Sequence, residues 1–117
     1  MNLALVADDL SVVRNIVALL LRQKGFVVVE ASDGTEALEF VRKLPLRLAI
    51  LDYQMPGYDG VEVARSLRDR DSSIPILIYT SSPKELPHDV SEIADIVEKD
   101  SDGIDKLAKW LATLNQG

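Results

Sequence analysis

The sequence has 117 residues, enough for one domain around a single core. It contains no cysteine and one histidine, which excludes disulfides, thiolate metal sites and any zinc site that needs several histidines. The formal net charge of −6 argues against direct binding to nucleic acid, because phosphate contacts need clustered Lys and Arg.

The N-terminal stretch is apolar but short. It lacks a basic flank, and Asp8 and Asp9 end it before the core of a signal peptide would be complete. No apolar run approaches the roughly 20 residues that span a bilayer. We therefore expect a cytoplasmic chain without membrane contact.

Five short runs rich in Val, Ile and Leu are expected to be strands: residues 3–7, 26–31, 46–51, 74–79 and 94–97. Their continuous apolar character is typical of strands buried on both faces of a parallel sheet. Amphipathic stretches lie between them. This alternation predicts an α/β fold with right-handed crossovers and helices on both faces.

The amphipathic stretches carry helix boundary signals. Ser11 is expected to cap the first helix and Gly25 to end it. Asp33 is expected to cap the second, with an acidic residue three positions later. The third helix should begin near Gly60, and the last should follow residues 101–102.

The connection between the fourth and fifth strands departs from this plan. Pro83 and Pro87 each remove a backbone donor, and a proline inside a helix costs about 3 kcal/mol. The sequence therefore predicts a shortened or irregular fourth helix, with at most a turn or two from Pro87 onward.

Polar side chains gather where the strands end. The first strand ends in Asp8 and Asp9, the third in Asp52, the fourth in Thr80 and the fifth near Lys99. In such sheets, the carboxyl ends of the strands hold the functional site. Taken singly, these residues also fit a helix cap, a turn aspartate, a strand end or a surface lysine. Their joint placement favours one shared site.

The three carboxylates predict a metal site. Neighbouring strands lie about 4.8 Å apart, so carboxylates at their ends can share a cation. Two such charges about 4 Å apart repel by roughly 4 kcal/mol at an effective dielectric constant of 20. Mg²⁺ suits the cluster because it is a hard ion that takes a few carboxylates and keeps several waters. With an ordinary pKa of about 3.9, Asp52 is expected to be an ionised nucleophile that needs no general base.

The ordered set resembles the receiver domain of two-component response regulators, the CheY-like superfamily, over essentially the whole chain. The matching features are the acidic pair, Asp52, the Met-Pro-Gly-Tyr-Asp-Gly segment at 55–60, Thr80 and Lys99. The resemblance implies a doubly wound, flavodoxin-like α/β fold with a five-stranded parallel sheet of strand order 2-1-3-4-5. It also implies one receiver domain over residues 1–117 without an output domain.

The resemblance further implies the role of each site residue. Asp52 would accept the phosphoryl group, while Lys99 and Thr80 would contact the phosphoryl oxygens. The Mg²⁺ ligands would be Asp9 and Asp52 directly, Asp8 largely through water, and the backbone carbonyl of Gln54.

The expected function is phosphorelay signal transduction in a two-component system. A histidine kinase or phosphotransfer protein would phosphorylate Asp52 with Mg²⁺ and so switch a protein-interaction surface. The module would catalyse only transfer to and from its own aspartate. An enzyme acting on external substrates is disfavoured, because the strand ends offer no general base or glycine-rich cofactor pattern. A degenerate receiver that binds a partner constitutively stays open, as do the downstream partner and a weak homodimer.

Three departures from the family pattern favour that alternative. Asp100, and not proline, follows Lys99, so a trans peptide bond is expected there. Ile96 stands three positions before Lys99, where the family places its aromatic switch residue. The connection after Thr80 is short and contains two prolines, so the surface that it forms is expected to be remodelled.

Overall fold

The computed structural model describes residues 2–114; Met1 and residues 115–117, which the expected domain also includes, lie outside the described part. The strands are β1 (Leu3–Ala7), β2 (Val27–Ala31), β3 (Leu48–Leu51), β4 (Ile76–Thr80) and β5 (Asp95–Glu98). The helices are α1 (Ser11–Gln23), α2 (Gly34–Lys43), α3 (Gly60–Arg70) and α4 (Gly103–Leu114). Across the described residues, no helix is both long and apolar enough to cross a bilayer.

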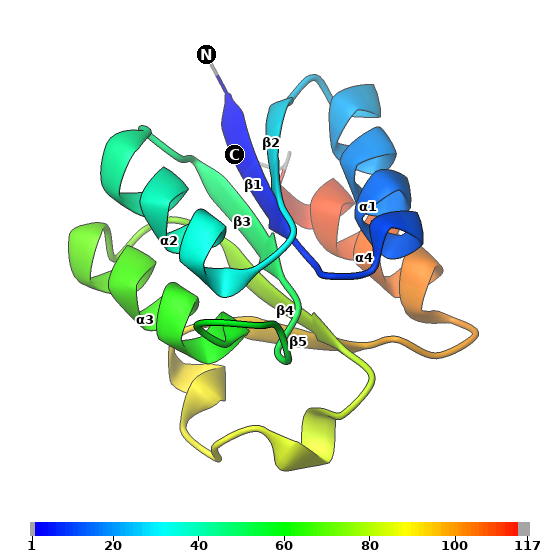
Figure 1. The fold of residues 1–117 in the computed structure, drawn as a ribbon. Helices are drawn as coiled ribbons and strands as arrows, with labels where there is room; N and C mark the ends of the chain where they lie inside the picture. The colour runs from blue at the N-terminus through cyan, green and yellow to red at the C-terminus, as the bar shows by residue number, and fades with distance from the viewer. Residues whose placement is uncertain (1, 115–117) are drawn as a thin grey trace.

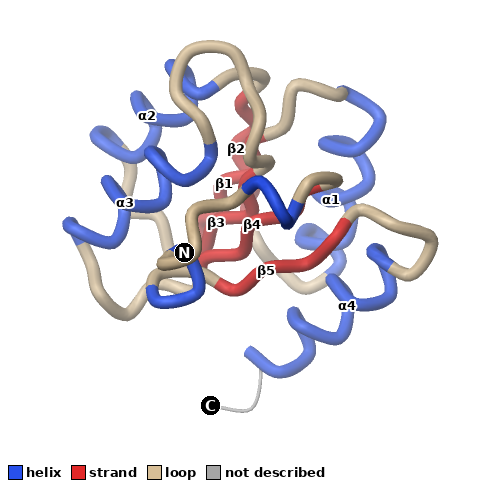
Figure 2. The backbone as a smooth tube through the Cα atoms, turned by 90° about the horizontal axis from the view of Figure 1, so that it is seen from below, coloured by secondary structure: helices blue, strands red, loops and turns tan. Residues whose placement is uncertain are grey.

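The strands form one parallel sheet of order β2-β1-β3-β4-β5, which confirms the predicted doubly wound, flavodoxin-like fold. Helices α2 and α3 cover one face and α1 and α4 the other (Figure 1, Figure 2). Because strand side chains alternate between faces, each face has its own apolar cluster. Leu5 and Ile78 belong to the cluster under α2 and α3, and Val6 and Leu77 to the one under α1 and α4.

The prediction of strands buried on both faces holds for β1, β3 and β4 only. Strands β2 and β5 form the two edges of the sheet, and most of their residues are partly or fully exposed. Val27 on β2 is 49% exposed and Ile96 on β5 is 39% exposed. Apolar character alone does not distinguish an edge strand from a central one.

The C-terminus of α1 is closed as predicted by Gly25. Its φ of 92° lies in the left-handed region that favours glycine. Its N–H donates to the carbonyl of Arg22, and the N–H of Phe26 donates to that of Leu21. This pair of bonds satisfies two carbonyls that the end of the helix leaves free.

Acidic side chains cap α2 and α3. Asp33 accepts a bond of 2.8 Å from the N–H of Glu36, as predicted. Asp59 likewise accepts from the N–H of Glu62, and the Glu62 carboxylate accepts from the N–H of Asp59. This reciprocal arrangement fixes the start of α3 at Gly60, also as predicted.

The prediction that Ser11 caps α1 is wrong. Leu10 occupies the cap position and Ser11 is the first helical residue. The N–H of Leu10 donates to Asp8 Oδ1 at 2.9 Å, so the loop is organised by an acidic residue at the end of β1. Tertiary placement of Asp8 outweighs the local capping preference of serine.

The connection between β4 and β5 contains two 3₁₀ turns, η1 (Pro83–Glu85) and η2 (Val90–Glu92), which confirms the predicted irregularity. Only η2 follows Pro87 as predicted, because Pro83 itself begins η1. Side chains from α3 hold it in place. The guanidinium of Arg68 donates to the carbonyls of Ile93 at 2.6 Å and Ile74 at 2.7 Å. Arg65 forms an ion pair of 3.1 Å with Asp89.

Candidate functional site

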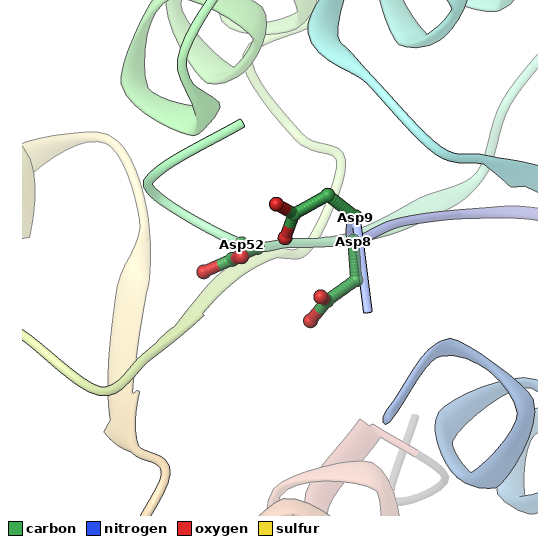
Figure 3. Close-up of side chains that lie close together, drawn as sticks. All are labelled: Asp8, Asp9 and Asp52. Atoms are coloured by element: carbon green, nitrogen blue, oxygen red, sulfur yellow. The ribbon is translucent and has the colours of Figure 1, made fainter. Parts of the chain in front are cut away.

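Three acidic side chains meet at the carboxyl ends of β1 and β3. Asp8 and Asp9 follow β1, and Asp52 follows the adjacent strand β3. One carboxylate oxygen from each residue lies within 4.8 Å of the others (Figure 3). Asp8 and Asp52 are buried, whereas Asp9 is exposed. The structure thus brings together the predicted acidic cluster.

Lys99 joins this cluster from the end of β5. Its backbone N–H donates to the carbonyl of Thr80, and its peptide bond to the next residue is trans, as predicted. Its Nζ lies 2.7 Å from Asp8 Oδ2 and 3.3 Å from Asp52 Oδ1. Three carboxylates and one ammonium leave two uncompensated negative charges, so the residues present fit a divalent cation.

Burial raises the pKa of Asp52 from 3.8 to about 6. The negative charge of Asp8 adds to this increase, while the ammonium of Lys99 opposes it. The expectation of an ordinary pKa is therefore wrong, because it did not include the burial of the carboxyl group. The group is still mostly ionised at neutral pH.

A pocket of about 450 Å³ opens beside this cluster. Its lining residues are Asp9, Leu10, Asp52, Gln54, Ser81 and Lys99. Four of them are predicted site residues, whereas Leu10 and Ser81 were not predicted from the sequence. Leu10 directly follows Asp9, and Ser81 directly follows Thr80. Including one more residue after each strand end would therefore have identified both.

Of the predicted residues Thr80 and Gln54, only Gln54 lines the pocket. Thr80 is buried, and its Oγ1 accepts a bond of 3.0 Å from the N–H of Ser82, which leaves the hydroxyl proton free to donate. Among the described residues, the pocket lining includes Ser81 and not Thr80. Gln54 does line the pocket, and its Nε2 donates to Glu85 Oε2 at 2.9 Å. This bond connects the loop after β3 with η1.

A close backbone contact fixes Asp52 against α3. A Cβ atom at Gly60 would lie 2.0 Å from the carbonyl oxygen of Asp52. Only glycine therefore allows the first residue of α3 to sit against the end of β3. The Asp59–Glu62 capping box then begins the helix at this point. The local sequence thus sets the backbone from which the Asp52 carboxylate projects.

Comparison with known proteins places the chain in a family. Residues 4–109 match the model of the response regulator receiver domain. The chain is 35% identical over 116 residues to the CAI-1 autoinducer sensor kinase/phosphatase CqsS of Vibrio cholerae, covering 92% of this chain and 17% of that protein. It is 40% identical over 77 residues to the DNA-binding response regulator MtrA of Mycobacterium tuberculosis, covering 66% and 33%. The chain therefore spans a third or less of these two relatives.

Solved structures agree with this assignment. The response regulator TrrA of Thermotoga maritima, described in complex with Mg²⁺ and BeF, is 30% identical with a TM-score of 0.80, covering 97% of this chain and 99% of that one. The chemotaxis response regulator CheY4 of Vibrio cholerae is 27% identical with a TM-score of 0.81, covering 97% and 98%. With its acidic strand ends and 2-1-3-4-5 sheet, the chain belongs to the receiver domain family of response regulators, the signalling modules of two-component systems.

Proposed function

We propose that Asp52 accepts a phosphoryl group in a Mg²⁺-dependent reaction and that this changes a surface read by another protein. The donor is a cytoplasmic histidine kinase or phosphotransfer protein. The observation that carries the proposal is the convergence of Asp8, Asp9 and Asp52, with Lys99 Nζ 3.3 Å from Asp52 Oδ1. Family membership supports the same reading, as does the relative described with Mg²⁺ and BeF.

The residues that would hold Mg²⁺ are Asp9 and Asp52 directly, Asp8 largely through water, and the backbone carbonyl of Gln54. Three carboxylates within 4.8 Å of one another support this set, since Mg²⁺ prefers oxygen ligands and retains part of its water shell. When bound, the ion would neutralise charge on the phosphoryl oxygens and so reduce their repulsion of the attacking carboxylate.

The nucleophile is a carboxylate oxygen of Asp52. It forms a bond to phosphorus as the bond from phosphorus to the donor breaks, and the donor leaves with that electron pair. The product is an acyl phosphate on Asp52. With its Nζ already 3.3 Å from Asp52 Oδ1, Lys99 can pair with one phosphoryl oxygen. The Thr80 hydroxyl proton is free to donate to another.

Exposed apolar side chains beside the pocket suit a protein donor. Leu10 lines the pocket and is 56% exposed. Val12, Ile16 and Leu19 are also exposed and recur every three or four residues, which places them along one stripe of α1. Exposed apolar patches of this kind mark protein-binding surfaces. We propose that the donor protein docks on this stripe and delivers the phosphoryl group to the adjacent pocket.

The test is incubation with acetyl phosphate, with and without Mg²⁺, followed by intact mass measurement. The wild-type chain should gain one phosphoryl group only with Mg²⁺, and Asp52→Asn should gain none. Asp69→Asn is the matched control, because Asp69 is an exposed aspartate on α3 away from the pocket. Phosphorylation of Asp52→Asn, or equal labelling without Mg²⁺, would contradict the proposal.

A constitutive binding module is the second candidate. The position of the family's aromatic switch residue holds Ile96, which is 39% exposed, and the connection from β4 to β5 lacks an α-helix. A wild-type chain that takes no phosphoryl group, and whose partner binding is unchanged in Asp52→Asn, would favour this second function.

A further inference from the structure

Tyr79 lies next to the site but has no role in the mechanism described above. It precedes Thr80 on β4 and is 5% exposed. Its side chain belongs to the apolar cluster beneath α1 and α4. The Nζ of Lys99 lies over its ring, 5.6 Å from the ring centroid. The ring is thus the aromatic neighbour of the ammonium that also contacts Asp8 and Asp52.

The first residue of α4 restricts this ring. A Cβ atom at Gly103 would lie 2.8 Å from Tyr79 Oη and 3.2 Å from its Cε1. Glycine is therefore what allows α4 to begin so close to the ring. Because α4 limits the movement of the ring, the ring offers Lys99 a rigid surface.

A lysine side chain needs such support to stay in one place. Its flexible stem loses conformational entropy when its ammonium is fixed. The negative face of an aromatic ring attracts an ammonium within about 6 Å, and more strongly where water is excluded. The Lys99 side chain is only 12% exposed, so this attraction is weakly screened.

The aromatic position of the family pattern does not supply this contact. Ile96 is paired in register with Ile78, whereas Tyr79 is paired with Val97. Because side chains at paired positions share a face, Ile96 projects to the face opposite Tyr79. The aromatic ring beside Lys99 therefore comes from β4 and not from β5, and it lies on the side of α1 and α4.

We propose that Tyr79 is a positioning residue whose ring holds the Lys99 ammonium in the place from which it contacts Asp8, Asp52 and the incoming phosphoryl group. That the Tyr79 ring fixes the position of the Lys99 ammonium is the positional part of the proposal, and it is argued from the geometry alone. That this position speeds phosphorylation is the kinetic part, and it rests on the proposed function. The two parts therefore need separate measurements.

The positional part is tested by NMR on the full chain without a phosphodonor. The Lys99 Hε protons, assigned with Lys99→Met, should show ring-current shifts and NOEs to the Tyr79 ring. Tyr79→Phe keeps the ring and should retain both signals, whereas Tyr79→Leu should return these protons to ordinary lysine shifts. Identical Lys99 shifts in Tyr79→Phe and Tyr79→Leu would overturn the proposal, whatever happens to phosphorylation.

The kinetic part is tested by a double-mutant cycle at saturating Mg²⁺ with acetyl phosphate. Tyr79→Leu should slow phosphorylation about threefold to thirtyfold, the factor that corresponds to a cation–π contact, and Tyr79→Phe should restore the rate. In a Lys99→Met background, Tyr79→Leu should have no further effect. A purely structural role predicts the same slowing in both backgrounds, which would overturn the proposal. If the wild type takes no phosphoryl group, the proposed function fails, and the NMR result still decides the role of Tyr79.

Discussion

The crossovers on either side of β4 are held in place by different interactions. The one before β4 is α3, a helix of 11 residues that begins with a capping box and buries Val63 and Leu67 in the core. The one after β4 has two 3₁₀ turns, and polar side chains of α3, Arg65 and Arg68, secure it. This connection also buries Val90 in the core cluster under α2 and α3, so hydrogen bonds from α3 and apolar packing together position it where prolines prevent a helix.

This difference matters for the site because both crossovers border the pocket. Asp52 and Gln54 precede α3, whereas Thr80 and Ser81 lead into the irregular connection. Regular structure and core packing hold the first pair. Thr80 is itself buried at the end of the central strand β4, so of the second pair only Ser81 lies in the irregular connection. Under the proposed function, the surface that changes on phosphorylation is expected beyond Ser81, where the connection lacks an α-helix.

The largest loss in the free energy of unfolding is expected from Arg68→Met. It removes the donors to the carbonyls of Ile74 and Ile93, and an unsatisfied buried group costs about 1–3 kcal/mol. The free energy of unfolding should fall by about 2–4 kcal/mol in urea titrations. Arg42→Met is the control, because Arg42 is 61% exposed and, within residues 2–114, its side chain pairs only with Glu39. Equal losses in both variants would contradict the role of Arg68.

The second largest change in the free energy of unfolding is expected from Asp52→Asn, at the end of β3 and before α3. Because its pKa is raised from 3.8 to about 6, the folded state binds this proton more tightly than the unfolded chain does. Its contribution to stability is therefore lost as the pH rises from about 4 to about 6. Without Mg²⁺ at pH 7, Asp52→Asn should raise the free energy of unfolding by about 1–3 kcal/mol.

The measurement for Asp52 is a series of urea titrations from about pH 4 to about pH 8. Wild type and Asp52→Asn should differ least at the acidic end, diverge up to about pH 6, and then keep a constant difference. A difference that does not change with pH would show that Asp52 is not the titrating group.

A smaller loss is expected from Asp59→Ala, which removes the cap of α3. Substituting an aspartate N-cap costs about 1 kcal/mol, and here the bond from the N–H of Glu62 is lost. Asp33→Ala removes the corresponding cap of α2 and should cost a similar amount. Thermal melts measure both. If Asp59→Ala lowered the free energy of unfolding more than Arg68→Met did, the cap of α3 would matter more for stability than the Arg68 contacts, contrary to expectation.

The smallest effect is expected from Arg65→Met. Arg65 and Asp89 are 44% and 42% exposed, and exposed ion pairs contribute about 0.2–1 kcal/mol. The loss in free energy of unfolding should shrink further between about 0.1 M and about 1 M salt. A salt-independent loss would mean that Arg65 acts through packing and not through its charge.

Much of the site was predictable because its residues follow strands that the sequence identifies. The carboxyl ends of parallel strands share one edge, so Asp8, Asp9 and Asp52 had to lie near one another once β1 and β3 were adjacent. The prediction that Ser11 caps α1 failed because Asp8, placed by the sheet, takes the N–H of Leu10.

By itself, the sequence determined the alternating elements, the helix ends at Gly25 and Asp33, and the irregular segment that contains the two prolines. These features depend on backbone preferences and hydrogen bonds within a few residues. Tertiary structure alone decided the raised pKa of Asp52, the contacts of Arg68 and the place of Tyr79 beneath Lys99. Burial and long-range charge depend on which distant segments pack together, and short-range sequence patterns do not contain that information.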